Sequence, residues 1–296
     1  MNKVKEIEWN TIPSELKPKD KRLDKIEHQY LPKLPATFYV MGRCGSGKSS
    51  ILWSLITEGY TYKEKGKKKK SVFDEALIYL GTLDSKDAFE NKLPIDNKLI
   101  LEEYDPVSFD EYMNDLKLHQ MEKLAKNQSP LNTLIVWDDF VAEGLMKKSK
   151  VNTAPPIEKL ALTSRHEANC TMFFCSQVYK NSGFSKPSIR NNITCFIISK
   201  MSRAELVKIA EELCDDYEPD EWLYHYDTIL AKRPYNFVTF DYRRPEGEKW
   251  RERFHLPFPK PKRLEQIQKS LKFNRITDKN RVDESSDEGA TSSDEE

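Results

Sequence analysis

The sequence contains no long hydrophobic run and few cysteines. No apolar stretch approaches the roughly 18 residues that a membrane-spanning helix needs, which argues against an integral membrane protein. The first residues, Met1–Glu6, contain no apolar segment of a signal peptide, so we expect a protein that is not secreted. The five cysteines form no CxxC pair and no zinc-ligand spacing, which is typical of free thiols in a reducing compartment.

Net charge is zero over the 296 residues, but the charge is unevenly distributed. Residues 282–296 hold seven acidic residues and no basic one, which leaves about +7 on residues 1–281. A basic body with an acidic tail is compatible with binding to a polyanion. It is equally compatible with a solvated surface and a disordered end, so charge alone does not assign a partner.

The composition divides the chain into four parts. Residues 1–35 are rich in Lys, Glu and Pro and are predicted to form an extended N-terminal arm with Trp9 and Tyr30 as anchors. Residues 36–260 are predicted to form one domain, followed by a short helical or extended segment over 261–274. Residues 275–296 contain no apolar set to bury and are predicted to be a disordered acidic tail.

Short apolar runs alternate with helical patterns through the predicted domain. Helices are expected at residues 51–56, at a capping box formed by Ser108–Glu111, and after the caps Ser202 and Glu205. Strands that are apolar on both faces predict a mostly parallel sheet covered by helices on both sides. The predicted strands are Thr37–Met41, Ala76–Leu80, Leu99–Leu101, Thr133–Trp137, Thr171–Cys175, Thr194–Ile198 and Asn236–Phe240, the last as a late strand or hairpin arm.

A glycine-rich segment directly follows the first predicted strand. Residues Gly42–Ser49 match the pattern G-x-x-x-x-G-K-[ST] at every fixed position, between a predicted strand and a predicted helix. Such a loop turns backbone N–H groups towards phosphate oxygens, and the helix N-terminus adds positive potential. We expect Lys48 to reach the β and γ phosphates and Ser49 to coordinate Mg²⁺. The predicted nucleotide-binding residues are Gly42, Arg43, Cys44, Gly45, Ser46, Gly47, Lys48, Ser49 and Ser50.

Two adjacent acids, Asp138 and Asp139, end the apolar strand Thr133–Trp137. One acid at such a strand end can hold Mg²⁺ opposite Ser49, and a second can polarise an attacking water. Since neighbouring side chains on a strand point to opposite faces, the chain must bend for both to serve one site. Without the phosphate loop, such a pair would indicate no more than a turn or a helix cap.

The strand Thr171–Cys175 continues to Gln177, whose amide can contact the γ phosphate or its water, although an ordinary strand-end glutamine is the alternative. Two predicted strands lie between the loop and the acid pair. We therefore expect a strand between the loop strand and the Asp strand in the sheet. This arrangement is typical of P-loop ATPases with an added catalytic acid. The sequence contains no [NT]-K-x-D guanine-reading motif, which favours ATP over GTP.

The loop Gly42–Ser49, the pair Asp138–Asp139, and the segment Thr163–His166 followed by a strand ending in Gln177 occur in this order. Ser188–Asn192 and a further apolar strand follow. This combination resembles the FtsK–HerA superfamily of ring ATPases, and within it the poxvirus-type genome-packaging ATPases of DNA viruses. The resemblance covers roughly residues 36–200. It implies an α/β P-loop NTPase fold with a mostly parallel central sheet flanked by helices, RecA/FtsK-like with an added catalytic acid.

The resemblance also implies a function and a set of roles. It implies a homo-oligomeric ring, hexameric or pentameric, that hydrolyses ATP with Mg²⁺ to drive double-stranded DNA into a capsid. A capsid protein would be a further partner, and the protein would act in the host-cell cytoplasm at the site of virus assembly or in the virion. By position, Asp138 would bind the metal, Asp139 would be the catalytic acid and Gln177 the γ-phosphate sensor. Arg165 would be the finger reaching a neighbouring subunit's ATP, with Arg190 as the second candidate.

Two other functions and two segments stay open at this stage. A P-loop kinase for a nucleoside or small metabolite is one alternative, although we find no Arg-rich lid. A nucleotide-gated DNA-binding scaffold is the other. The run Lys63–Lys70 is predicted to be a loop, which either contacts the DNA backbone or only adds solubility. The acidic tail either docks a partner or competes with DNA for the basic surface.

Overall fold

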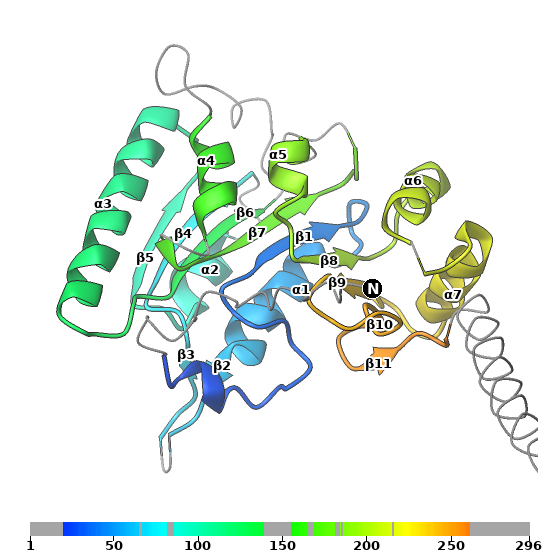
Figure 1. The fold of residues 1–296 in the computed structure, drawn as a ribbon, viewed down its shortest axis with the longest axis horizontal. Coiled ribbons are helices and arrows are strands. Elements are labelled where there is room, and N and C mark those ends of the chain that lie inside the picture. The colour runs from blue at the N-terminus through cyan, green and yellow to red at the C-terminus, as the bar shows by residue number, and fades with distance from the viewer. Residues whose placement is uncertain are drawn as a thin grey trace, which may run out of the picture.

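The computed structural model describes residues 20–64, 67–81, 86–138, 155–164, 168–180, 184, 186–214 and 216–260. Their centre is a nine-stranded sheet with the order β11-β10-β9-β8-β1-β7-β6-β4-β5 (Figure 1). Its strands are β1 (Thr37–Met41), β4 (Glu75–Leu80), β5 (Asn97–Leu101), β6 (Thr133–Asp138), β7 (Cys170–Ser176), β8 (Cys195–Ile198), β9 (Val238–Asp241), β10 (Trp250–Glu252) and β11 (Leu256–Pro257).

The sheet is parallel from β5 through β4, β6, β7 and β1 to β8, and antiparallel from β8 to β11. The predicted mostly parallel sheet is therefore confirmed. The strand between β1 and β6 is β7, so the expectation of an intervening strand is also confirmed. The two strands that precede β6 in sequence, β4 and β5, lie on its far side.

Helices cover both faces of the sheet, as the apolar strands predict (Figure 1). One buried cluster joins the sheet to α3 (Pro106–Ala125), α4 (Pro156–Thr163), α5 (Pro187–Arg190), α6 (Arg203–Leu213) and α7 (Pro219–Ala231). A second cluster joins the opposite face to α1 (Lys48–Ser54) and α2 (Lys86–Lys92). Because β1 contributes Phe38 and Val40 to the α1 cluster but Tyr39 and Met41 to the other, its side chains alternate between two buried layers.

A two-stranded hairpin, β2 (Thr61–Tyr62) and β3 (Lys70–Ser71), follows a π-helical turn at Leu55–Gly59. Of the expected loop Lys63–Lys70, the described residues 63–64 and 67–69 lie between these two strands, whereas Lys70 begins β3. β3 leads into the amino end of β4, whereas the phosphate loop follows the carboxyl end of β1. Because these strands are parallel, the hairpin and the loop lie at opposite ends of the strands (Figure 1).

The segment before β1 packs on the face of the sheet that α1 covers. A 3-10 turn occupies Leu23–Lys25, and the Arg22 guanidinium pairs with Asp20 and with Asp74, each at 2.6 Å. The Tyr60 hydroxyl donates to the carbonyl of Pro32 at 2.9 Å. These contacts fix residues 20–35 to the body of the domain.

Tyr30 is 54% exposed, but its carbonyl accepts from the Arg244 guanidinium at 2.7 Å and its ring lies 6.3 Å from that of His255. Two local expectations are wrong. The strand around Leu99 is not buried, because β5 is the edge strand and Leu99 is 52% exposed. Helix α3 does not begin at Ser108: Asp105 is its N-cap and accepts a hydrogen bond from the Ser108 amide at 2.8 Å, with Pro106 in the first turn.

Several predictions lie outside the described residues, namely those for Trp9, Asp139, Arg165, residues 261–274 and residues 275–296. Among the helices that the structure does describe, none combines the length and the apolar character needed to cross a membrane.

Candidate functional site

The loop Gly42–Gly47 connects the carboxyl end of β1 to the first residue of α1, and both neighbouring strands hold its beginning. The Gly42 amide donates to the Ser176 carbonyl of β7 at 3.1 Å. On the other side, the Arg43 amide donates to the Lys200 carbonyl at 2.8 Å, just beyond β8. The loop is therefore fixed by the sheet itself.

At two positions of the loop the structure requires glycine. A Cβ atom at Gly42 would overlap the hydroxyl oxygens of Ser46 and Ser199, so only glycine fits. Gly47, the N-cap of α1, has φ +88°, in the left-handed region that disfavours side chains. A Cβ there would also approach the ring of Tyr235 to 3.2 Å.

A short hydrogen-bond chain supports the loop from beneath. The Ser199 hydroxyl donates to the Met41 carbonyl at 2.9 Å and accepts from the Ser46 hydroxyl at 2.8 Å. The Tyr226 hydroxyl of α7 donates to the Ser199 carbonyl at 2.6 Å, and burial raises the pKa of this phenol. The backbone after β8 thus links α7 to the loop.

The loop and the start of α1 fit a polyphosphate. Lys48 is only 4% exposed, and its ammonium lies 3.4 Å from the carbonyl oxygen of Arg43, so the cation is folded back over the loop. Ser49 is half-buried, Ser50 is exposed, and the first amides of α1 have no partner within their own helix. Buried positive charge at the N-terminus of a helix is the environment that phosphate oxygens prefer.

Asp138 lies on the same face of the sheet as α1. In β6, Leu134 and Val136 belong to the buried cluster that contains α1, whereas Ile135 and Trp137 belong to the opposite one. Alternation therefore directs Asp138 towards the face that carries Lys48 and Ser49. The carboxylate is 3% exposed at the carboxyl end of the strand.

Gln177 directly follows β7 at the same edge. Trp137 is in register with Phe174, and Met41 with Ser176, so β6, β7 and β1 end together. The Gln177 side chain is exposed next to the first residue of the loop. The structure thus places Lys48, Asp138 and Gln177 at the carboxyl ends of neighbouring strands, and the roles assigned to them from the sequence stay predictions.

The donor set fits magnesium bound together with phosphate. Among the described residues there is no group of three or more His, Cys, Asp and Glu side chains that would hold a metal without another ligand. Mg²⁺ typically binds one or two protein oxygens together with substrate phosphates and water. Ser49 and Asp138 are the residues here that would hold it.

Arg190 contacts two residues of its own chain. The guanidinium forms an ion pair with Glu212 of α6 at 2.7 Å and lies 5.8 Å from the ring centre of Tyr179. Its side chain is 20% exposed. Arg190 therefore holds the end of α5 to α6 in this arrangement.

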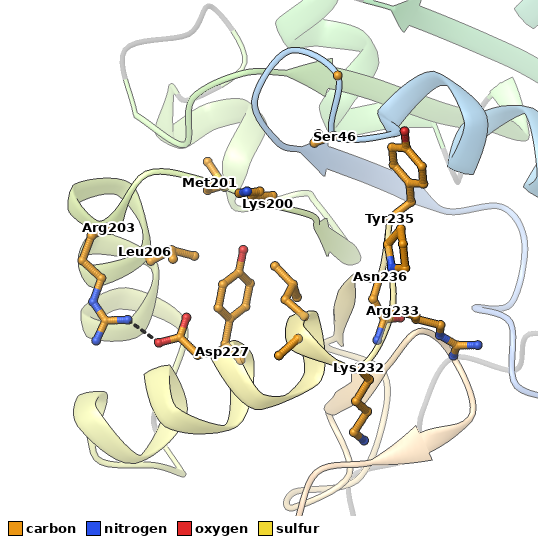
Figure 2. Close-up of a pocket in the computed structure, with 15 residues that line it drawn as sticks. Ser46, Lys200, Met201, Arg203, Leu206, Asp227, Lys232, Arg233, Tyr235 and Asn236 are labelled. Carbon is orange, nitrogen blue, oxygen red and sulfur yellow. Dashed lines mark hydrogen bonds and ion pairs between the residues drawn. The ribbon is translucent and has the colours of Figure 1, made fainter.

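Sequence reasoning missed a large cavity beside the loop (Figure 2). It has a volume of about 850 Å³ and lies between Gly45, Ser46, the residues after β8, α6 and the end of α7. Tyr235 and Asn236, from the turn that precedes β9, complete its wall. Ser199 does not line this cavity, but the sequence offers a signal for its supporting role, since it follows β8, which is parallel to β1; for the turn around Tyr235 there is no such signal.

No protein-family model matches the sequence, and no match to a curated protein was found. Among solved structures, the cytoplasmic domain of EssC is 14% identical over 59% of this chain, with a TM-score of 0.41. The cytoplasmic domain of the Thermomonospora curvata type VII secretion ATPase EccC is 14% identical over 70%, with a TM-score of 0.42. EccC ATPases 2 and 3 in complex with a signal sequence peptide are 14% identical over 70%, with a TM-score of 0.43.

This chain spans 35%, 22% and 35% of the lengths of those three structures. Likenesses this distant assign neither a family nor an activity. The fold is stated from the topology described above: an α/β P-loop NTPase with a mostly parallel central sheet flanked by helices, and one strand between the loop strand and the Asp strand.

Proposed function

We propose that this protein is a Mg²⁺-dependent ATPase that uses ATP hydrolysis to move double-stranded DNA, as a homo-oligomeric ring of the FtsK–HerA type. At its most specific, the proposal is packaging of a viral genome into a capsid, at the assembly site in the host cell or in the virion. The resemblance in the sequence supports the DNA and ring parts of this proposal, and the geometry of the site supports the ATPase part.

The single observation that carries the ATPase proposal is that three adjacent strands end side by side. β1 delivers the phosphate loop, β6 delivers Asp138 and β7, between them, delivers Gln177. A glutamine between a phosphate loop and a metal-binding acid is suited to sensing the terminal phosphate or orienting a water. A kinase would instead need an acceptor site there.

Each predicted site residue has a role in ATP hydrolysis that the chemistry of its side chain allows. Lys48 supplies buried positive charge against the β and γ phosphates, and the amides of the loop cradle their oxygens. Ser49 and Asp138 would hold a magnesium ion, which would supply positive charge against the phosphates. Gln177 orients the attacking water, and the carboxylate of the predicted catalytic acid Asp139 receives its proton.

The β2–β3 hairpin supports the DNA part of the proposal. Its described lysines Lys63 and Lys67–Lys70 are all exposed. Two acidic partners, Glu64 for Lys67 and Glu27 for Lys69, offset only part of this charge. A projecting hairpin with net positive charge fits the phosphate backbone of duplex DNA.

The test is steady-state ATP hydrolysis by the full chain, with and without double-stranded DNA. We expect DNA to stimulate hydrolysis. Lys48→Ala and Asp139→Asn should each lower kcat by about 100-fold or more, because each removes charge stabilisation or proton transfer in the transition state. Lys126→Ala is the control, since it removes an exposed lysine at the end of α3 and should change nothing.

Two results would contradict the proposal in different ways. Equal hydrolysis by a monomer with and without DNA would reject translocation and leave an ATPase. Phosphate transferred to a nucleoside or small metabolite instead of water would establish the kinase alternative.

A further inference from the structure

A second cavity borders the phosphate loop and differs in character from the larger one. Its volume is about 330 Å³, within the range of small-molecule sites. Gly47, at the end of the loop, lines it together with Ser50 and Ser54 on one side of α1. Tyr235 lines both cavities and so separates them. The second cavity therefore begins where the loop ends and follows the first turns of the helix.

The remaining walls come from segments far apart in the sequence. His28, Tyr30 and Leu31 of the N-terminal segment form one wall, and residues from the turns before β9 and after β10 form the other. The rings of Phe237 and Phe254 lie 5.6 Å apart and those of Tyr30 and His255 6.3 Å apart. The lining is thus aromatic on both sides and carries few charges. Its ring-bearing residues are His28, Tyr30, Tyr235, Phe237, Phe254 and His255.

Tyr235 is held where its ring remains open to a ligand. Its φ is +54°, unusual for a residue with a side chain, and the side chain is 68% exposed. The next residue, Asn236, is buried and donates to the carbonyl of Ile229 at 2.8 Å and to Glu252 at 3.1 Å. Glu252, 7% exposed, also pairs with Lys232. A buried framework therefore fixes the turn that presents an exposed aromatic ring beside Gly47.

We infer that this cavity holds the purine base of the nucleotide, with the Tyr235 ring as its stacking surface. The inference rests on the proposed function, since it requires the phosphates to lie in the loop. Lys48 and Ser49 serve the β and γ phosphates, so the nucleoside continues past Ser50 along α1 into the cavity. Aromatic faces bind bases by stacking without a demand for particular hydrogen bonds.

The larger cavity is less suited to a base. Its lining includes four cationic side chains, those of Lys200, Arg203, Lys232 and Arg233, against the single acid Asp227, which pairs with Arg203 at 2.8 Å (Figure 2). Positive charge favours an anion rather than an uncharged ring. The larger cavity is lined by two aromatic residues, Tyr226 and the shared Tyr235, whereas six ring-bearing residues line the smaller one.

The test compares Mg²⁺·ATP with Mg²⁺·tripolyphosphate in titration calorimetry on the full chain. Wild type should bind ATP about 5- to 150-fold more tightly, the range that stacking of one base on an aromatic side chain provides. Tyr235→Ala should remove most of this difference by weakening ATP alone, because tripolyphosphate has no base. Tyr235→Phe should retain it, since the aromatic face remains.

Tyr224→Ala is the matched control, because Tyr224 is also a tyrosine that is 68% exposed but lines neither cavity. Equal affinity of wild type for ATP and tripolyphosphate would overturn the base site while leaving the phosphate loop intact. A Tyr235→Ala effect equal on both ligands would also overturn it, because the ring would then act only by supporting Gly47. Failure of wild type to bind either ligand would reject the proposed function itself.

Discussion

At the scale of single residues, Glu205 connects α6 to the loop that carries Gln177. The sequence predicts Glu205 as half of a capping box with Ser202. Ser202 does cap α6, accepting from the Glu205 amide at 3.4 Å. The carboxylate of Glu205, however, accepts from the amides of Tyr179 and Lys180 at 2.6 and 3.2 Å. Only the tertiary fold brings these amides to α6, so this second role could not be predicted from local spacing.

We predict that Glu205 positions Gln177 without touching the nucleotide. Glu205→Ala leaves two backbone N–H groups without their acceptor, and should destabilise the fold by about 2 kcal/mol. Because the affected amides lie two and three residues after Gln177, kcat for ATP hydrolysis should fall more than KM rises. Steady-state kinetics at saturating and limiting ATP separates these two effects. An unchanged kcat would show that the loop holds its position without the carboxylate.

The pH dependence of stability gives an independent readout of the same carboxylate. Burial raises the pKa of Glu205, but hydrogen bonds from Lys208 and from the amides of Tyr179 and Lys180 outweigh it, and the pKa lies below the usual 4.5. A lowered pKa stabilises the fold at pH values above 4.5, and this contribution is lost as the pH falls through the folded-state value. The difference in thermal unfolding between wild type and Glu205→Gln should therefore be largest near pH 7 and should shrink as the pH falls below 4.5.

At the scale of elements, the strands of the parallel sheet could be predicted because each is a short apolar run buried on both faces. β5 was misjudged because an apolar run does not reveal whether a strand is central or at the edge. The start of α3 was misjudged because Asp105 and Ser108 are both good caps, and the geometry of Pro106 selects the first. Helix α7 was not predicted, although Trp222 and Tyr226 form a buried stripe on it.

The β2–β3 hairpin carries a prediction of its own. If its lysines contact DNA phosphates, the logarithm of the DNA-binding constant should fall against the logarithm of salt concentration with a slope of about −4 to −5. Lys67→Gln/Lys68→Gln removes two exposed cations and should reduce the size of this slope by about 2. Fluorescence anisotropy with a duplex at four salt concentrations measures it.

The control for the hairpin is Lys92→Gln/Lys126→Gln. These two lysines are equally exposed but lie at the ends of α2 and α3, away from the hairpin. The control pair lowers the net charge by the same amount, so it should leave the slope unchanged if contact matters. Equal slopes for both double variants would mean that the hairpin serves only solubility.

At the scale of the whole molecule, the order of strands decides which residues can meet. An acid on the strand next to β1 would face the nucleotide directly, but here β7 separates β1 from β6 and brings Gln177 into the gap. The sequence predicted this separation by counting the two strands before Asp138. Those strands, β4 and β5, instead extend the sheet beyond β6, and the intervening strand comes from later in the chain. The predicted outcome was right, although the strand that produces it is a different one.

In the proposed ring, one arginine would serve the ATP site of a neighbouring subunit. Arg190 is already paired with Glu212 in its own chain, so we predict that Arg165 acts across the interface. Lys48→Ala subunits keep Arg165 but lack a working loop, whereas Arg165→Ala subunits keep the loop. In a ring of head-to-tail contacts, about one quarter of the interfaces in an equal mixture should join an intact loop to an intact arginine. ATPase activity should then exceed that of either variant alone.

The matched mixture replaces Arg165→Ala with Arg190→Ala. Because Arg190 supports its own subunit, this second mixture should hydrolyse ATP at the mean rate of its two components, without complementation. Rescue with Arg190→Ala but not with Arg165→Ala would exchange the two roles and require the pair with Glu212 to open on assembly. Absence of rescue with both would remove the finger altogether. ATP hydrolysis would then need no neighbouring subunit, and a ring would have to be justified by DNA movement alone.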